Sequence, residues 1–144
     1  MRSELNFNQI LSDLAGRFPS HLAVSDFTSG KQRKITFSEL AKRVGELKEL
    51  ISRSTRPDQG VAILLPAGIE SICVFWAAVC ADRTYIPLYV DMAADRLRMI
   101  LEDTGPALVI HERDSEPALG QVLMELGYEE ELRDEVGSLA FFRK

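Results

Sequence analysis

The chain has 144 residues, 46% hydrophobic and 27% charged, which is the composition of a folded domain and not of a disordered or fibrous chain. Its formal net charge of −5 argues against a nucleic-acid-binding surface as the main role. No apolar run is long enough to cross a bilayer, and no signal-peptide stretch follows the first residues, so we expect a cytoplasmic protein.

The first third of the sequence predicts a helix, a β-hairpin and a second helix. Residues 7–18 carry apolar side chains at spacings of three and four, which places them on one stripe of an amphipathic helix. Two short extended runs at 22–26 and 33–36 flank turn-forming residues, which is typical of a β-hairpin. Thr36 and Glu39 have the spacing of a capping box, so we expect a helix to begin there.

The middle of the sequence alternates between strand-like and helix-like segments. Residues 61–65, 84–88 and 107–110 are apolar runs of strand length, which is typical of strands buried on both faces of a sheet. A helical pattern over 68–80 separates the first two runs, and a second, with Asp91 as its expected N-cap, separates the last two. This βαβαβ order predicts an α/β fold with a mainly parallel sheet, right-handed crossovers and helices on both faces.

Beyond residue 111 the pattern weakens. Pro117 fits the first turn of another helix, residues 129–131 and 133–135 are expected at the surface, and residues 139–142 form a candidate strand. We interpret residues 1–144 as a single domain in three parts: a helix–hairpin–helix entry over 1–56, the βαβαβ core over 57–111, and a helix and tail over 112–144.

The sequence contains no standard phosphate-binding loop. Neither G-x-G-x-x-G nor G-x-x-x-x-G-K-[ST] is present, so neither usual way of presenting backbone N–H groups to phosphates is encoded. Residues 65–68 follow a strand and open a helix. We interpret them as a simple βα turn, and the alternative is an anion resting on the helix N-terminus.

The cysteines and histidines do not form a recognisable site. Cys73 and Cys80 lie on one helical stretch about 10 Å apart, too far for a disulfide, so we expect buried thiols, with a redox role as the alternative. His21 and His111 have no Cys or carboxylate at a metal-ligand spacing. We therefore expect no catalytic, cofactor-binding or metal-ligating residue in this sequence.

Two further assignments follow from periodicity. Tyr85, Pro87 and Tyr89 alternate along one strand and are expected on a sheet face that a helix covers, with an aromatic ligand platform as the alternative. Arg98 and Glu102 have the i,i+4 spacing of an exposed ion pair on a helix.

Three aromatic residues give expectations about packing and assembly. Trp76 lies on the apolar stripe of the helix over 68–80, so we expect it against the sheet. Phe141 and Phe142 are adjacent in an extended segment, so their side chains point to opposite faces of the strand. A single buried face can cover only one of the two rings. We therefore expect the other Phe to need a second copy of the chain or another protein.

Several segments match a known family in order and spacing. Residues 35–40, with the sequence ITFSEL, resemble the first core motif of the adenylate-forming enzymes. This superfamily includes acyl-CoA synthetases, luciferases and nonribosomal-peptide adenylation domains. Residues 76–110 resemble its second core motif, and residues 61–66 match the strand between the two. The resemblance extends over about residues 6–111, and the combined pattern is far more specific than either motif alone.

The sequence departs from the family pattern at two places. Asp82 stands where the family usually has Gly, and Tyr89 and Val90 stand where it has Asp-Pro. Asp tolerates the left-handed backbone conformation that Gly provides, so we expect the fold to be kept.

The resemblance implies ATP-dependent activation of a carboxylic acid to an acyl-adenylate, followed by transfer to a thiol. It also implies that the chemistry lies in later motifs: a Ser/Thr/Gly-rich phosphate loop, an acidic adenosine-binding segment and a catalytic lysine in a mobile C-terminal domain. None of these motifs is in the 144 residues, although residues 139–142 faintly resemble the strand before the phosphate loop.

We therefore expect the chain to be a truncated or split N-terminal subdomain of such a ligase. It should be inactive alone, bind the remaining part of the enzyme, and depend on ATP and Mg²⁺ only within the complete enzyme. The alternative is a non-catalytic protein-interaction module derived from the same fold. Neither nucleic acid nor a membrane is an expected partner.

Overall fold

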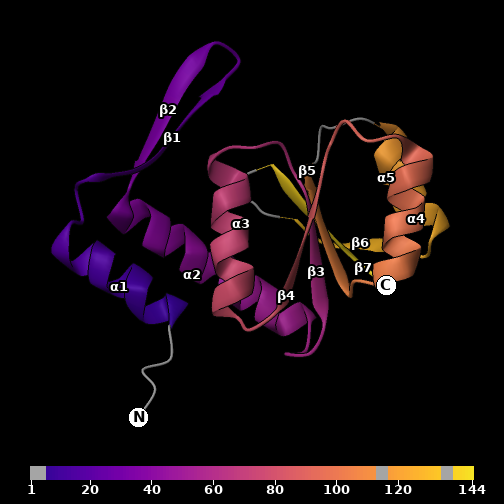
Figure 1. Cartoon of the computed structure of the whole chain (residues 1–144), viewed down its shortest axis with the longest axis horizontal. Helices are drawn as coiled ribbons and strands as arrows, with labels where there is room; N and C mark the ends of the chain where they lie inside the picture. Colours follow the sequence, from indigo (N-terminus) through magenta and orange to yellow (C-terminus); the bar gives the residue numbers. More distant parts are fainter. Residues whose placement is uncertain (1–5, 113–116, 134–137) are drawn as a thin grey trace.

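The computed structural model describes residues 6–112, 117–133 and 138–144. A five-stranded sheet has helices on both faces, and a separate two-stranded hairpin projects from one end (Figure 1). The helices are α1 (Phe7–Arg17), α2 (Phe37–Ser54), α3 (Ile69–Cys80), α4 (Ala94–Thr104) and α5 (Pro117–Glu125). The strands are β1 (Leu22–Thr28), β2 (Lys31–Thr36), β3 (Gly60–Leu64), β4 (Thr84–Leu88), β5 (Leu108–Glu112), β6 (Glu129–Arg133) and β7 (Leu139–Arg143).

The five-stranded sheet has the order β4-β3-β5-β7-β6. β3 pairs in parallel with both β4 and β5, which confirms the predicted βαβαβ core. β7 pairs antiparallel with β5, with Phe141 opposite Ile110, and β6 pairs antiparallel with β7. The sheet is therefore mixed, because the βαβαβ core supplies a parallel half and the last two strands supply an antiparallel half.

The surface position predicted for residues 129–131 is confirmed, and the same segment forms a strand that no sequence signal predicts. Residues 129–133 form β6, which pairs with β7 at one side of the sheet. The side chains of residues 129–131 are exposed, as expected, and residues 134–135 lie outside the described ranges. Glutamate has a low strand propensity, so the acidic run carries no strand signal, and pairing with β7 overrides that propensity.

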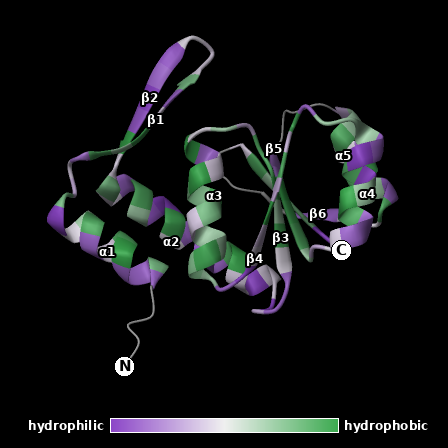
Figure 2. Cartoon of the chain, in the orientation of Figure 1, coloured by the Kyte–Doolittle hydropathy of each residue, from purple (hydrophilic) through white to green (hydrophobic). Residues whose placement is uncertain are grey.

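Two hydrophobic cores lie on opposite faces of the sheet. α2 and α3 cover one face, with α1 packed on their outer side, and α4 and α5 cover the other (Figure 1). α3 is coloured hydrophobic over most of its length (Figure 2). β3 contributes to both cores, with Val61 and Ile63 in the first and Ala62 and Leu64 in the second. A strand buried in this way needs apolar residues at every position, which explains the unbroken apolar run.

Several local features agree with the sequence. Thr36 begins α2 with a capping box: its Oγ1 accepts the Glu39 N–H at 3.2 Å, and the Glu39 carboxylate accepts the Thr36 N–H at 3.0 Å. Ser29 and Gly30 at the hairpin tip both have positive φ, 54° and 76°, as a two-residue type I′ turn requires. Asp82 has a φ of 57°, which is the left-handed conformation expected of a residue in place of Gly.

Two predictions for α4 are wrong. Its N-cap is Ala93, without a side-chain hydrogen bond, because Asp91 lies in a separate turn before the helix. Arg98 pairs with Glu125 of α5, and not with Glu102 on its own helix. α4 and α5 cover the same face of the sheet, so a carboxylate from the neighbouring helix competes with the i+4 residue.

The prediction that a helix covers the aromatic residues of β4 is also wrong. Tyr85 and Tyr89 expose 36% and 73% of their surface, although Phe75 of α3 contacts Tyr85 with ring centroids 4.9 Å apart. β4 lies at the end of the sheet order, where α3 reaches the strand but does not extend over it. The Thr84 N–H donates to the Gln59 carbonyl oxygen, on the β3 side of the strand. Successive N–H groups of a strand point to opposite sides, so the backbone nitrogen of Pro87 faces the free edge. Proline there removes no hydrogen bond of the sheet.

Phe141 and Phe142 are both buried, so the expectation that one of them needs a partner is wrong. Phe141 is 0% exposed in the first core, and Phe142 is 9% exposed in the second. β7 lies between β5 and β6, and helices cover both faces of the sheet, so adjacent side chains both find a core. Neither side chain is therefore left bare to hold two copies of the chain together.

Trp76 lies at the margin of the first core. Its side chain is only partly buried and meets the ring of Phe7 edge-to-face, with centroids 5.7 Å apart. The fully buried positions of α3 include Cys73 and Ala77, which are 0% exposed. Trp76 therefore joins α3 to α1, and does not fill the space under the sheet.

Replacing Trp76 with alanine should lower the free energy of unfolding by about 1–3 kcal/mol, because the ring is only partly buried. Phe141→Ala is the fully buried reference and should lose about 3–5 kcal/mol. Urea unfolding of both variants measures the difference. Equal losses would contradict the marginal position of Trp76.

Candidate functional site

A cavity of about 560 Å³ lies beyond the C-terminal ends of the paired strands β3 and β5. α3, which follows β3, packs on one face of the sheet, and α5, the next described helix after β5, packs on the other. Open α/β sheets bind ligands at such switch points. The hairpin forms one wall of the cavity and the start of β7 another, and its polar lining includes Asp26, Arg33, Glu70, Glu112 and Ser138.

Asp26 of β1 places a carboxylate on the N-terminus of α3. Its Oδ2 accepts the backbone N–H of Ile69 at 2.8 Å, across 43 positions of sequence. Arg33 of β2 donates to both carboxylate oxygens, from Nε at 3.0 Å and from an Nη at 2.7 Å. A Cβ on Gly68 would lie 2.8 Å from Asp26 Oδ2, so the glycine leaves room for the carboxylate.

This arrangement decides between the two interpretations of residues 65–68. The helix N-terminus does hold a negative charge, as the partial positive charge there favours. That charge is the protein's own Asp26 carboxylate, already bonded to Arg33. A ligand anion would have to displace it, so the favoured interpretation as a βα turn agrees with the structure.

The charged groups around the cavity are coupled in pairs. The hydrogen bonds from Arg33 and from the Ile69 N–H hold the pKa of Asp26 below its ordinary value. The Asp26 bond in turn raises the pKa of Arg33, and the charges of Glu70 and Glu112 add to that shift. Arg43 of α2 lies 3.4 Å from the Glu70 carboxylate. The cavity is thus bordered by salt-bridged groups that hold the hairpin, α2 and α3 together.

The buried nucleophilic and titratable groups lie elsewhere. Cys73 and Cys80 are buried free thiols, as predicted, and burial raises the pKa of Cys73 to about 12, which keeps it protonated. His111 is buried with Nδ1 3.1 Å from the Leu64 carbonyl oxygen, and burial lowers its pKa. His21 is exposed and stacks on Phe18. Within residues 6–112, 117–133 and 138–144, no three His, Cys, Asp or Glu side chains are grouped to hold a metal.

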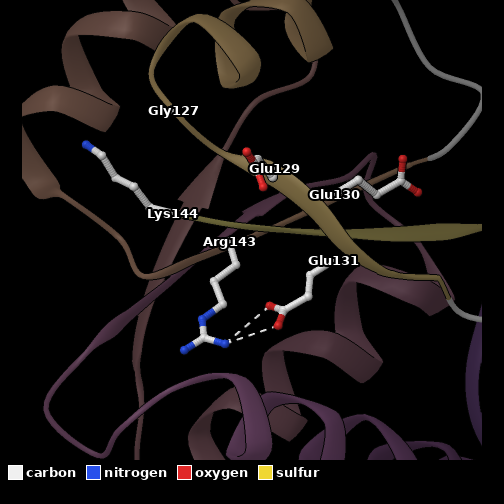
Figure 3. A pocket seen from close by; sticks show the side chains of 6 residues that line it. All are labelled: Gly127, Glu129, Glu130, Glu131, Arg143 and Lys144. Atoms are coloured by element: carbon white, nitrogen blue, oxygen red, sulfur yellow. Dashed lines mark hydrogen bonds and ion pairs between the residues drawn. The ribbon is translucent and has the colours of Figure 1, made fainter.

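A second hollow, of about 480 Å³, lies at the other end of β7 (Figure 3). Its basic side chains are engaged: an Nη of Arg143 donates to Glu131 at 3.1 Å, and Lys144 Nζ lies 5.6 Å from the centre of the Tyr128 ring. Glu129 and Glu130 add further negative charge. The hollow is therefore poorly suited to a phosphate group.

Sequence reasoning did not identify Asp26 and Arg33 as important residues. They face each other across the hairpin, which the turn signal alone predicts, but their contact with α3 depends on tertiary packing. No helix in the described part of the chain is long and apolar enough to span a membrane.

Comparison with known proteins gives a consistent set of similarities. A family model described as "AMP-binding enzyme" matches residues 11–139. Tyrocidine synthase 1 of Brevibacillus parabrevis is 22% identical over 128 residues, which cover 88% of this chain and 11% of that protein. A dimodular nonribosomal peptide synthase of Bacillus subtilis is 32% identical over 81 residues, which cover 56% of this chain and 3% of that protein.

Solved structures show the same fold at low sequence identity. The N-terminal domain of FACL13 from Mycobacterium tuberculosis superposes with a TM-score of 0.71 and 21% identity, over 82% of this chain and 29% of that chain. This chain therefore spans only a small part of the relatives that it matches, at most 11% of the two synthases above.

Asp26→Asn should be less stable than the wild type at pH 7, and the difference should shrink in acid. Because the folded-state pKa of Asp26 is lowered, its charge stabilises the fold above the unfolded-state pKa of about 3.9. That contribution is lost as the pH falls through the folded-state value. Thermal unfolding of both proteins between pH 7 and pH 2.5 measures this, and a difference that did not change with pH would contradict it.

Gly68→Ala tests the close approach of Asp26 to α3. The backbone of Gly68 is extended, so alanine is unfavourable there only through its contact with the carboxylate. We expect Gly68→Ala to destabilise the wild type more than it destabilises Asp26→Ala. A double-mutant cycle by urea unfolding measures the coupling, and additive effects would show that the two residues do not interact.

Proposed function

The chain belongs to the AMP-binding enzyme family, and from that premise we propose that its residues form the opening part of the AMP-binding domain of a carboxylic-acid-activating ligase. The observation that carries the proposal is the match of the family model to residues 11–139, which is nearly the whole chain. The fold agrees, because the N-terminal domain of a related protein superposes on most of this structure.

In the proposed complete enzyme, a carboxylate oxygen of the acid attacks the α-phosphorus of ATP. The bond to pyrophosphate breaks, the acyl-adenylate forms, and a thiol then displaces AMP. ATP and Mg²⁺ are the cofactors of that reaction. The similarity to a peptide synthase favours an amino acid or a related acid as the substrate class.

We further propose that these 144 residues do not catalyse the reaction by themselves. Departure of pyrophosphate needs preorganised N–H donors and positive charge around the phosphates. The N-terminus of α3 is occupied by Asp26, and the sequence has no glycine-rich phosphate loop. Arg143 and Lys144 border an acidic hollow. The remaining motifs would have to come from further residues of the same polypeptide or from a second chain.

A non-catalytic interaction module derived from the same fold is the second candidate. The observation that favours it is the exposure of large apolar side chains away from the cores, with Phe27 77% and Tyr89 73% exposed. Such residues are common at protein interfaces. An enzyme part and an interaction module differ in one property: addition of the missing motifs restores activity only to the enzyme part.

The isolated 144-residue chain should show no acid-dependent exchange of pyrophosphate into ATP. The physical reason is the absence of a phosphate loop from its sequence. Exchange of radiolabelled pyrophosphate is measured with a panel of amino acids and fatty acids, with a complete adenylation domain as the positive control. Exchange above the blank with any acid would contradict the proposal that these residues are inactive alone.

A gain-of-function measurement separates the two candidates. This chain is fused to, or mixed with, the remainder of the adenylation domain of a related synthase, and the exchange is measured again. Recovery of exchange supports the enzyme part. A folded, stable hybrid without exchange favours the interaction module.

A further inference from the structure

The β1–β2 hairpin stands apart from the five-stranded sheet (Figure 1). It is anchored on one face: Val24 and Ile35 pack on the first core, and Asp26 bonds to α3. A two-stranded ribbon is only marginally stable without further contacts. In the described ranges no other strand pairs with β1 or β2, so the outer edge of β2 presents unpaired backbone groups.

The charge of the hairpin is opposite to that of the chain. β2 carries Lys31, Arg33 and Lys34, and Asp26 is the one acidic residue of the two strands, whereas the whole chain has a net charge of −5. Figure 2 shows β2 in hydrophilic colours. Asp26 is bonded to Arg33, and no ion pair is recorded for Lys31 or Lys34 among the described residues. The hairpin therefore carries surplus positive charge.

The register places these cations on both faces of β2. Arg33 lies opposite Asp26 on the anchored face, with Lys31 two positions before it, and Lys34 lies on the outer face. A strand that adds beside β2 brings its own side chains about 5 Å from these positions on both faces. Acidic side chains at those positions gain ion pairs, and basic side chains are repelled.

We propose that the outer edge of β2 is a docking site for an extended acidic segment of a partner protein, which adds to the hairpin as a third strand. The backbone edge supplies main-chain hydrogen bonds, which is the recognition mode of β-strand addition. Lys31 and Lys34 select an acidic sequence. The same lysines repel a second hairpin, so the edge discriminates against pairing with a copy of itself.

A protein segment fits this surface better than a nucleic acid. The three cations of β2 lie within four residues of one strand, and the rest of the chain carries the excess of acid that gives the net charge of −5. Phosphates could pair with the lysines but could not use the backbone edge. Strand pairing therefore separates the two classes of ligand experimentally.

The test uses the full chain and a labelled, capped octapeptide of sequence TEVEEVET. Two peptides are controls: TEPEEPET keeps every charge but prevents strand pairing, and TKVKKVKT reverses the charge. Fluorescence anisotropy at 50 and 300 mM salt measures affinity, and amide hydrogen exchange of residues 31–35 reports pairing of the edge. We expect saturable, salt-sensitive binding of the first peptide alone, with slower exchange of the β2 amides.

Charge variants of the protein give the matched control. Lys31→Glu combined with Lys34→Glu should weaken binding at least about tenfold, because two attractive charges become repulsive. Lys42→Glu combined with Arg56→Glu makes the same change of net charge on exposed residues outside the hairpin, and should change affinity by less than about threefold. If the charge-reversed hairpin unfolds, Lys31→Gln with Lys34→Gln replaces it, with an intermediate loss expected.

Several results would overturn the proposal. Equal binding of TEVEEVET and TEPEEPET, or tighter binding of a single-stranded oligonucleotide, would make the surface a plain electrostatic patch. Equal losses in the two charge-reversed variants would remove the hairpin as the site. A dimer of the chain, detected by sedimentation without peptide and abolished by the Lys31 and Lys34 substitutions, would assign the edge to a second copy. Absence of saturable binding would also overturn it.

Discussion

The side chains of β3 alternate between the two hydrophobic cores. Both faces of this strand must be shielded from water, and this constraint positions the helices and strands around it. Val61 and Ile63 lie under α2 and α3, whereas Ala62 and Leu64 lie under α4 and α5. An apolar strand can be buried in this way only if the chain crosses over the sheet on both sides. The crossovers make β4 and β5 the parallel neighbours of β3. The cavity of about 560 Å³ lies at the C-terminal ends of β3 and β5, where the chain continues to opposite faces of the sheet.

The Asp26 carboxylate joins the hairpin to this framework. It satisfies an N–H group at the start of α3, which is the position where many α/β proteins hold an anionic ligand. Arg33 holds the carboxylate in its charged form, so the N-terminus of α3 is neutralised from within the protein. This gives a physical reason to place phosphate chemistry in another part of the proposed enzyme.

The sheet and the hairpin expose their edges differently. At β4, position 87 faces the free edge, and proline there removes the donor that an added strand would use. At β6 the side chains of residues 129–131 are acidic and exposed. β2 instead combines an open edge with basic side chains. The three edges therefore differ in the backbone donors and in the charge that they present to solvent.

The sequence by itself determined the elements whose signals are local. Periodicity identified α1 to α5, the capping box fixed the start of α2, and unbroken apolar runs identified β3 and β5 as strands buried on both faces. The order of those elements was sufficient to predict the parallel core, because a βαβ unit has few ways to pack. The core motifs of the family were also readable as sequence.

Only the tertiary structure decided the features that depend on neighbours distant along the chain. β6 forms because β7 lies beside it, and Phe142 is buried because α4 and α5 cover the face to which it points. Tyr89 is exposed because no described strand or helix continues the sheet beyond β4. Asp26 became recognisable only when α3 was placed against the hairpin. Each of these features depends on which distant segments lie beside the residue. A local pattern of side chains does not indicate such neighbours.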